Sequence, residues 1–271
     1  MTRDADVAIE FADIDWQGRP VRIEYQRIGF SARSSAPLVV FLHEGLGSVA
    51  MWKDFPRRLC DAGGFRGIVF SRPGYGRSTP RAPGESWTID FMHRQAWEVL
   101  PAFLDAVAAG EKPWLFGHSD GGSIALLFAA RFPERLAGLV AMAPHIFVED
   151  VTVANIEEAR KAYENGNLAE RLGRYHDDVD SAFGGWNRAW LDPVFRGWNI
   201  EGEIGDIRCP VLAIQGVDDE YGTLDQIRGI ARKVAQTRLF EILDCGHSPH
   251  RDQPETAIVA TISFINSQEK S

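Results

Sequence analysis

Cysteine is scarce in this sequence, which has three in 271 residues: Cys60, Cys209 and Cys245. They are too few and too scattered for a disulfide framework, and no Cys-x-x-Cys pair or cysteine–histidine spacing indicates a zinc site. We therefore expect reduced thiols and no metal. No sequence feature places a base beside Cys245, so we interpret it as a packed thiol and not as a nucleophile.

Long apolar runs and an excess of positive charge are also missing. No uncharged apolar stretch reaches the roughly 18 residues of a membrane-spanning helix, and the first ten residues hold acidic side chains but no signal-peptide core. The net charge of −9 disfavours nucleic acid and anionic membranes as partners. We expect a cytoplasmic, soluble protein that acts on a small molecule and binds neither nucleic acid nor membrane.

Short apolar runs alternate with helix-length segments along most of the chain. An antiparallel hairpin is expected first, with its turn within residues 13–20. Strands are expected in the runs listed next, which end at Gly, Pro or polar residues: PLVVFLHEG, GIVFSRPG, WLFGHS, LAGLVAMAP, CPVLAIQG and RLFEIL. Helices are expected over 51–62, 88–110, 123–133 and 223–236. The alternation predicts an α/β fold with a mostly parallel twisted sheet and helices on both faces.

Residues 146–204 break this alternation, because they are polar and helical in pattern and carry several aromatic side chains in their second half. We interpret them as a helical lid inserted into a core formed by residues 1–145 and 205–271. An apolar cleft between lid and sheet is expected, since pockets favour such junctions. Trp186 and Trp190 are candidate pocket residues.

The stretch Gly117-His118-Ser119-Asp120-Gly121 follows an expected strand and precedes an expected helix. A Gly-x-Ser-x-Gly turn in that setting pushes the serine hydroxyl out above the sheet. A serine hydroxyl is a poor nucleophile near neutral pH, so the hypothesis also needs a histidine base and a carboxylate. Both follow in the expected order, with Asp218 and Asp219 after one apolar strand and His247 after the next.

These pieces together resemble the α/β-hydrolase superfamily, in its serine-nucleophile branch. The resemblance is carried by FLHEGLGS, SRPGYGRS, GHSDGG, PVLAIQGVDD and GHSPHRDQPE, and it covers nearly the whole chain. It implies that Ser119 is the nucleophile, His247 the general base and Asp219 the orienting acid, because the acid usually stands three residues after the strand-ending glycine. Asp218 is the alternative acid.

The resemblance also implies an oxyanion hole formed by backbone N–H groups. We expect one donor from Asp120 and the other from Gly45 or Leu46, in the loop after VVFLHEG. His43 and Gly45 resemble the family's His-Gly signature, but Glu44 stands between them. Its carboxylate either binds a cationic or hydroxylated group of the substrate or caps the loop.

The expected activity is hydrolysis of a carboxylic ester of a small apolar or aromatic substrate through an acyl-enzyme, without a cofactor. The resemblance is shared among small bacterial carboxylesterases, enol-lactone hydrolases and hydrolases that cleave C–C bonds of aromatic ring-fission products. C–C cleavage is the alternative, and it would need basic residues for a substrate carboxylate, for which the lid offers Arg171, Arg174, Arg188 and Arg196. A non-catalytic binding protein is a third hypothesis. A homodimer is compatible with the sequence.

Overall fold

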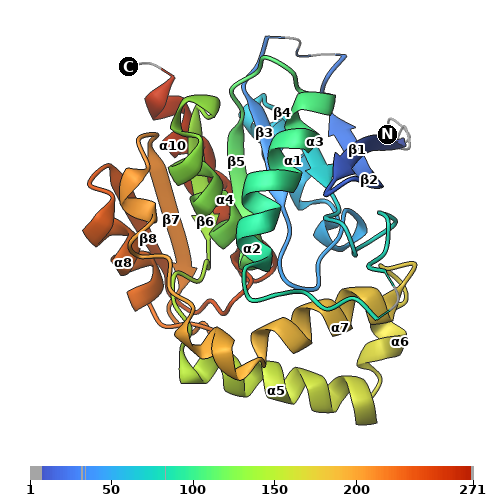
Figure 1. Ribbon diagram of the computed structural model, residues 1–271. Coiled ribbons are helices and arrows are strands. Elements are labelled where there is room, and N and C mark those ends of the chain that lie inside the picture. Colours follow the sequence, from blue (N-terminus) through green and yellow to red (C-terminus); the bar gives the residue numbers. More distant parts are fainter. Residues whose placement is uncertain (1–7, 32, 34, 83, 270–271) are drawn as a thin grey trace.

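One mixed sheet organises the protein. Within the residues that the computed structural model describes (8–31, 33, 35–82 and 84–269), eight strands are hydrogen-bonded in the order β1-β2-β4-β3-β5-β6-β7-β8 (Figure 1). The strands are β1 (Ile9–Trp16), β2 (Arg19–Ile28), β3 (Leu38–Leu42), β4 (Arg66–Phe70), β5 (Trp114–His118), β6 (Gly138–Met142), β7 (Val211–Gly216) and β8 (Thr237–Ile242). From β4 to β8 across the sheet all neighbours are parallel, which confirms the expected fold class.

The helices alternate with these strands as the pattern predicted. They are α1 (Phe55–Gly63), α2 (Phe91–Arg94), α3 (Leu100–Val107), α4 (Asp120–Arg131), α5 (Asp150–Asn165), α6 (Leu168–Leu172), α7 (Val179–Trp190), α8 (Asp225–Lys233), α9 (Pro249–Asp252) and α10 (Pro254–Gln268). In the described part of the chain, no helix combines the length and the apolar character needed to cross a membrane.

The two faces of the sheet carry separate apolar layers. Along β3, Val39 and Phe41 belong to the layer covered by α1 and α10, whereas Val40 and Leu42 belong to the layer covered by α3 and α4. Successive side chains of a strand point to opposite faces, so a strand buried on both faces is apolar throughout. The short continuous apolar runs in the sequence have this origin.

The N-terminal hairpin has a tighter turn than expected. β1 and β2 pair up to Trp16 and Arg19, so the turn is formed by Gln17 and Gly18 alone. Both residues have positive φ, +56° and +72°, as a two-residue type I′ hairpin turn requires. The turn lies within the expected range of residues 13–20 and is shorter than that range, and residues 1–7, which include part of the acidic start, lie outside the described residues.

The helix expected over residues 88–110 is interrupted by a wider turn. A π-helical turn at residues 95–99 separates α2 from α3. It ends at Val99, two residues before Pro101, which has no backbone N–H with which to continue a regular helix. Sequence periodicity does not reveal such a local widening.

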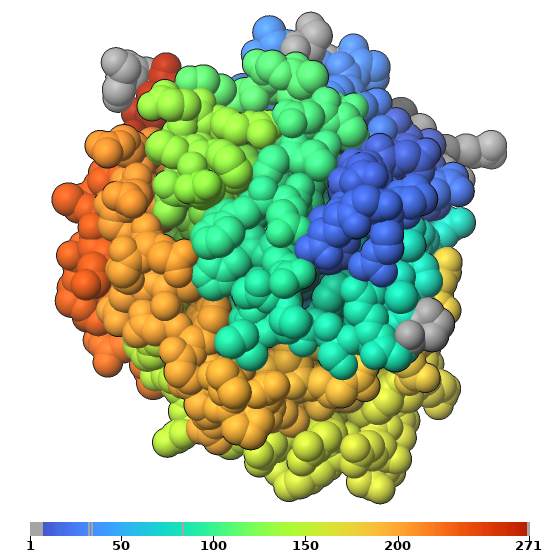
Figure 2. Space-filling view, viewed as in Figure 1, coloured from blue at the N-terminus to red at the C-terminus, as the bar shows by residue number. Residues whose placement is uncertain are grey.

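Helices α5, α6 and α7 lie together between β6 and β7 in sequence, at one end of the sheet (Figure 1). Two backbone hydrogen bonds, from Ile200 N to Ile146 O (2.8 Å) and from Val148 N to Trp198 O (3.3 Å), join the two ends of this segment. The segment therefore leaves and re-enters the sheet layer at one place. In the space-filling view it packs against the rest of the molecule along a broad front (Figure 2).

Candidate functional site

Ser119 lies in the turn between β5 and α4 and has a backbone conformation that L-residues rarely adopt. Its φ is +53° and its ψ −121°. Backbone hydrogen bonds hold this turn, from Ser119 N to Met142 O (2.9 Å) and from Gly122 N to Ser119 O (2.8 Å). Strain of this kind persists only where the surroundings impose it. Helix α4 begins at Asp120, three residues before the expected start at Ser123, because Ser119 itself stands at the N-cap.

Two glycines make the turn possible. A Cβ at Gly117 would come within 2.3 Å of Gly121 O, and a Cβ at Gly121 within 2.2 Å of Leu42 O at the end of β3. Both obstacles are backbone atoms, which cannot rotate away as a side chain can. The turn can therefore pack against the carboxyl end of the sheet only if these positions lack side chains.

His247 lies in the loop after β8 and joins Ser119 to Asp219. Its Nε2 is 2.9 Å from Ser119 Oγ, and its Nδ1 is 2.8 Å from Asp219 Oδ1. The main chain of His247 is also fixed, because its N–H donates to Glu220 Oε2 (3.0 Å) and its carbonyl lies 2.8 Å from Nε2 of His118. This is the geometry in which an imidazole can take a proton from a hydroxyl while a carboxylate orients the ring.

The structure places Asp219, and not Asp218, beside His247. Asp219 Oδ1 also accepts the backbone N–H of Tyr221 (2.8 Å). Burial acts to raise the pKa of Asp219, but the hydrogen bond and charge of His247 outweigh it and the net pKa is lowered. The backbone N–H of Asp218 donates to Cys245 O (3.0 Å) in the loop after β8.

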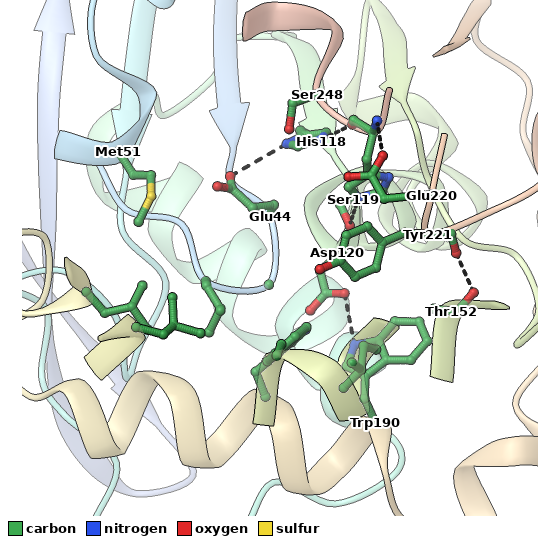
Figure 3. Close-up of a pocket in the computed structure, with 18 of the residues that line it drawn as sticks. Glu44, Met51, His118, Ser119, Asp120, Thr152, Trp190, Glu220, Tyr221 and Ser248 are labelled. Carbon is green, nitrogen blue, oxygen red and sulfur yellow. Dashed lines mark hydrogen bonds and ion pairs between the residues drawn. The ribbon is translucent and has the colours of Figure 1, made fainter. Parts of the chain in front are cut away.

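A cavity of about 410 Å³ opens above Ser119 (Figure 3). One side of the cavity is lined by Glu44 and by the three residues expected at the oxyanion hole, Gly45, Leu46 and Asp120. Helices α5, α6 and α7 line the opposite side. The lining includes Glu44, Gly45, Leu46, Ser119, Asp120, His247, Thr152, Ile156, Leu168, Leu172, Tyr175, Trp186, Trp190 and Tyr221. The expected pocket residues Trp186 and Trp190 therefore share one cavity with Ser119.

Gly45 and Trp186 are in close contact at this wall. A Cβ at Gly45 would come within 2.1 Å of Trp186 Nε1. Only a glycine lets the indole of α7 lie directly on the loop after β3.

The pKa values of two carboxyl groups that border the cavity are shifted in opposite directions. Burial acts to raise the pKa of Glu44, but His118 and Arg251 outweigh it and hold this pKa well below its usual range. Arg251 Nη2 lies 3.2 Å from Glu44 Oε1 and His118 Nδ1 lies 3.6 Å from Oε2, so both oxygens face a protein partner. Burial raises the pKa of Asp120 to about 6, although Arg72 and Trp190 oppose the rise.

Basic residues lie at the cavity in part as expected. Of the four arginines expected in the lid, Arg171 lines the cavity, and Arg196 instead pairs with Asp150. Lys53 and Arg251, which were not among the four, also line the cavity. No group of three or more histidine, cysteine or acidic side chains within the described ranges is arranged to hold a metal ion. Burial raises the pKa of the Cys245 thiol to about 11, which keeps it protonated near neutral pH.

Sequence reasoning missed several residues that contact His247. His145 stacks on its ring at 5.8 Å between centroids, and Tyr221 lies at 4.8 Å. Tyr221 and Glu220 follow Asp219 directly, so proximity in sequence could have indicated them. His145 follows β6, and only the neighbouring positions of β5 and β6 in the sheet bring it to the site.

A family model described as "Alpha/beta hydrolase family" matches residues 39–261, which is most of the chain. The protein belongs to the α/β-hydrolase family. Among curated relatives of this hydrolase is a 2-hydroxy-6-oxo-6-phenylhexa-2,4-dienoate hydrolase of Comamonas testosteroni, 24% identical, with 88% of this chain and 91% of the relative aligned.

Solved structures share the fold of this hydrolase at low sequence identity. An enol-lactonase from Burkholderia xenovorans superposes with a TM-score of 0.72 at 18% identity, over 95% of this chain and 100% of the other. A structure from a study of carboxylesterases of the thaumarchaeon Nitrososphaera gargenis gives 0.75 at 18% identity, over 95% and 99%.

Proposed function

We propose that this α/β hydrolase attacks a carbonyl carbon of a small molecule with Ser119. The observation that carries the proposal is the hydrogen-bonded series Ser119–His247–Asp219 at the floor of a cavity of about 410 Å³. His247 takes the hydroxyl proton as the bond to carbon forms, and Asp219 holds the imidazole in the required tautomer. The negative charge on the substrate oxygen is stabilised by the N–H of Asp120 and by that of Gly45 or Leu46.

The bond next to the carbonyl then breaks and leaves an acyl group on Ser119. The departing fragment takes the proton from His247, and a water molecule activated by the same ring releases the acid. In this proposal α5, α6 and α7 form the lid of the site, because they supply the wall that faces Ser119 and exclude water from it.

We favour a C–C bond of an aromatic ring-fission product as the bond cleaved, which reverses the order of preference drawn from the sequence alone. The relative from Comamonas testosteroni and further relatives at 22% identity are named as hydrolases of such compounds. Trp186 and Trp190 offer apolar surface to the body of such a substrate, and Lys53 and Arg171 offer positive charge to its carboxylate. The acidic residues Glu44, Asp120 and Glu220 line the same cavity, and Glu44 is paired with Arg251. The carbanion released by C–C cleavage is stabilised as an enolate and protonated from His247.

An ester is the second candidate, and the arrangement of proton donors favours it. His247 is the side chain that the structure shows hydrogen-bonded to Ser119 Oγ. Ester cleavage needs one proton at the leaving oxygen. C–C cleavage needs an additional proton transfer to carbon, which converts the dienol to its keto form before the bond breaks.

The test compares two substrate classes in wild type and Ser119→Ala. One is 2-hydroxy-6-oxo-6-phenylhexa-2,4-dienoate, followed by loss of its visible absorbance, and the other is a p-nitrophenyl ester series from acetate to decanoate with benzoate. Ser119→Ala should lower turnover by roughly 10⁴ or more with the fold retained. The substrate class with the higher Ser119-dependent kcat/KM identifies the bond.

A fluorophosphonate probe, which labels activated serines whatever the substrate, separates the remaining outcomes. Labelling of Ser119 without turnover of either class would mean a hydrolase of another carbonyl compound. Folded protein that is neither labelled nor active would contradict the proposal and favour a non-catalytic binding protein.

A further inference from the structure

The carbonyl oxygen of Glu44 is held by three donors. His43 Nδ1 lies 2.7 Å from it, Arg72 Nη2 donates over 2.9 Å, and the backbone N–H of Gly47 donates over 3.1 Å. The Glu44 carbonyl stands in the loop after β3, directly before Gly45. Few backbone carbonyls have more than two partners, because an sp² oxygen has two lone pairs.

This carbonyl belongs to the same peptide unit as the N–H of Gly45. A peptide unit is planar and nearly always trans, so its C=O and N–H point in opposite directions. Fixing the Glu44 oxygen on the side of His43 and Arg72 therefore fixes the Gly45 N–H on the opposite side. Gly45 lines the cavity together with Ser119. Hydrogen bonds to the carbonyl also polarise the peptide and strengthen its N–H as a donor.

The tautomer of His43 is set by a second hydrogen bond in the same group of residues. The backbone N–H of Arg72 donates to His43 Nε2 over 3.0 Å, so Nε2 is the acceptor and the proton resides on Nδ1, facing Glu44 O. Burial and the Arg72 charge hold the pKa of His43 well below its usual range. The ring therefore stays neutral and keeps this arrangement.

Arg72 also lies close to Asp120, the residue that follows Ser119. Its Nη2 lies 3.9 Å from Asp120 Oδ2, and its guanidinium stacks on Tyr75 with 4.6 Å to the ring centroid. The side chain is 1% exposed, and so is that of Asp120. The buried guanidinium of Arg72 thus binds the Glu44–Gly45 peptide and lies beside the side chain of Asp120. Gly45 and Asp120 are the residues on either side of the proposed oxyanion position.

We propose that His43 and Arg72 are positioning residues of the oxyanion hole, which orient the Glu44–Gly45 peptide and, through Arg72, the Asp120 side. This inference rests on the proposed function. It assigns a role in the reaction to two residues that touch neither the substrate nor Ser119. Their effect should fall on the transition state, where the oxyanion exists, and not on ground-state binding.

The test uses Arg72→Met, which removes the donors at similar size, and Arg72→Lys, which keeps the charge but loses the planar fork. Ser78→Ala is the matched control, because Ser78 Oγ bonds Ser71 O (2.6 Å) and Glu24 N (2.9 Å) in the same buried turn without contacting Glu44 or Asp120. The kcat and KM of each variant are measured. The kcat is calculated per active Ser119, whose concentration is determined by fluorophosphonate labelling carried to its endpoint. Affinity for phenylboronic acid is measured from how far it lowers the initial rate of fluorophosphonate labelling.

Phenylboronic acid is informative because the Ser119 oxygen adds to boron while its proton passes to His247, which leaves a tetrahedral anion with a boron-bound oxygen at the oxyanion position. Both Arg72 variants should lose about tenfold to 10²-fold in kcat and a similar factor in boronate affinity, with KM within about twofold. Ser78→Ala should show near-wild-type kcat even if its melting temperature falls.

Unchanged kcat per labelled serine in the Arg72 variants would overturn the inference while leaving the proposed function intact. The same would follow if Ser78→Ala lost as much kcat as they did, since the turn would then act only as general support. If both Arg72 variants fail to fold, His43→Asn is measured in the same way, because it removes the acceptor at Nε2. Wild type that shows no Ser119-dependent labelling or turnover would instead contradict the proposed function.

Discussion

The indole N–H of Trp190 donates a hydrogen bond of 3.1 Å to Oδ1 of Asp120, the residue that follows Ser119. Trp190 ends α7 and Asp120 begins α4, so this bond ties the helices between β6 and β7 to the turn that carries the nucleophile. Both side chains are buried, at 1% exposure each. A hydrogen bond to an enclosed carboxyl is costly to lose, because water cannot replace the donor.

Trp190→Phe should therefore destabilise the protein more than the loss of ring volume explains. Trp198→Phe is the matched control, since Trp198 is also buried but its Nε1 has no hydrogen-bond partner among the described residues. The free energy of unfolding, measured by urea denaturation, should fall by about 1–3 kcal/mol more in Trp190→Phe than in the control. Equal losses would mean that the bond to Asp120 contributes nothing to stability.

Asp219→Asn should abolish most activity, because an amide at this position no longer holds the tautomer of His247 that accepts the serine proton. We expect kcat to fall by about 10⁴, the loss known for this substitution in a serine protease with a Ser-His-Asp triad. Asp218→Asn is the control, one residue away and not hydrogen-bonded to His247 in the structure. A larger loss in the control would contradict the assignment of the acid.

Gly45→Ala should displace Trp186, because the added methyl group would lie 2.1 Å from its Nε1. The indole must move or the loop after β3 must shift, and either change disturbs the proposed oxyanion donor. We expect kcat to fall by at least about tenfold. At Gly202 the control substitution to Ala meets no atom within 4 Å and should leave kcat near wild type. Wild-type kcat in Gly45→Ala would show that this contact does not constrain the site.

Stability should fall on acidification because buried histidines are kept neutral in the fold. Burial lowers the pKa values of His43, His145, His176 and His250, that of His145 to about 3. The unfolded chain takes up protons on these rings below about pH 6.5, whereas the folded chain does not, so the free energy of unfolding falls as the pH drops. Asp120 acts in the opposite sense, because its raised pKa of about 6 lets the folded chain take up a proton first.

His145→Phe tests the histidine contribution. The slope of the unfolding free energy between pH 6 and pH 4 should decrease by up to about 1.4 kcal/mol per pH unit, the value for one proton. Urea denaturation at several pH values measures it. A slope equal to that of wild type would show that His145 takes up no proton on unfolding in this range.

Much of the architecture could be predicted because it depends on local pattern. The apolar runs that became β3 to β7 are continuous since both faces of the sheet are covered there, and the antiparallel hairpin followed from alternation and turn residues. The run that became β8 was wrongly expected to be buried on both faces, because β8 is the edge strand and most of its residues are exposed or half-buried. Element ends were less predictable. The helix before β5 contains a π-helical turn next to Pro101, and α4 starts at Asp120, because the backbone there is set by tertiary contacts.

By itself the sequence determined that Ser119 stands in a tight turn between a strand and a helix, because the Gly-x-Ser-x-Gly motif is local and a Cβ at Gly117 would meet the backbone of Gly121 only four residues on. The need for glycine at 121 is tertiary, because its obstacle is Leu42 O at the end of β3. The tertiary structure decided what surrounds that serine. The pairing of Asp219 with His247, the ion pair of Glu44 with Arg251 and the hydrogen bonds of Arg72 to Glu44 join loops far apart in the chain. They depend on the order in which the strands lie side by side, which no local pattern encodes.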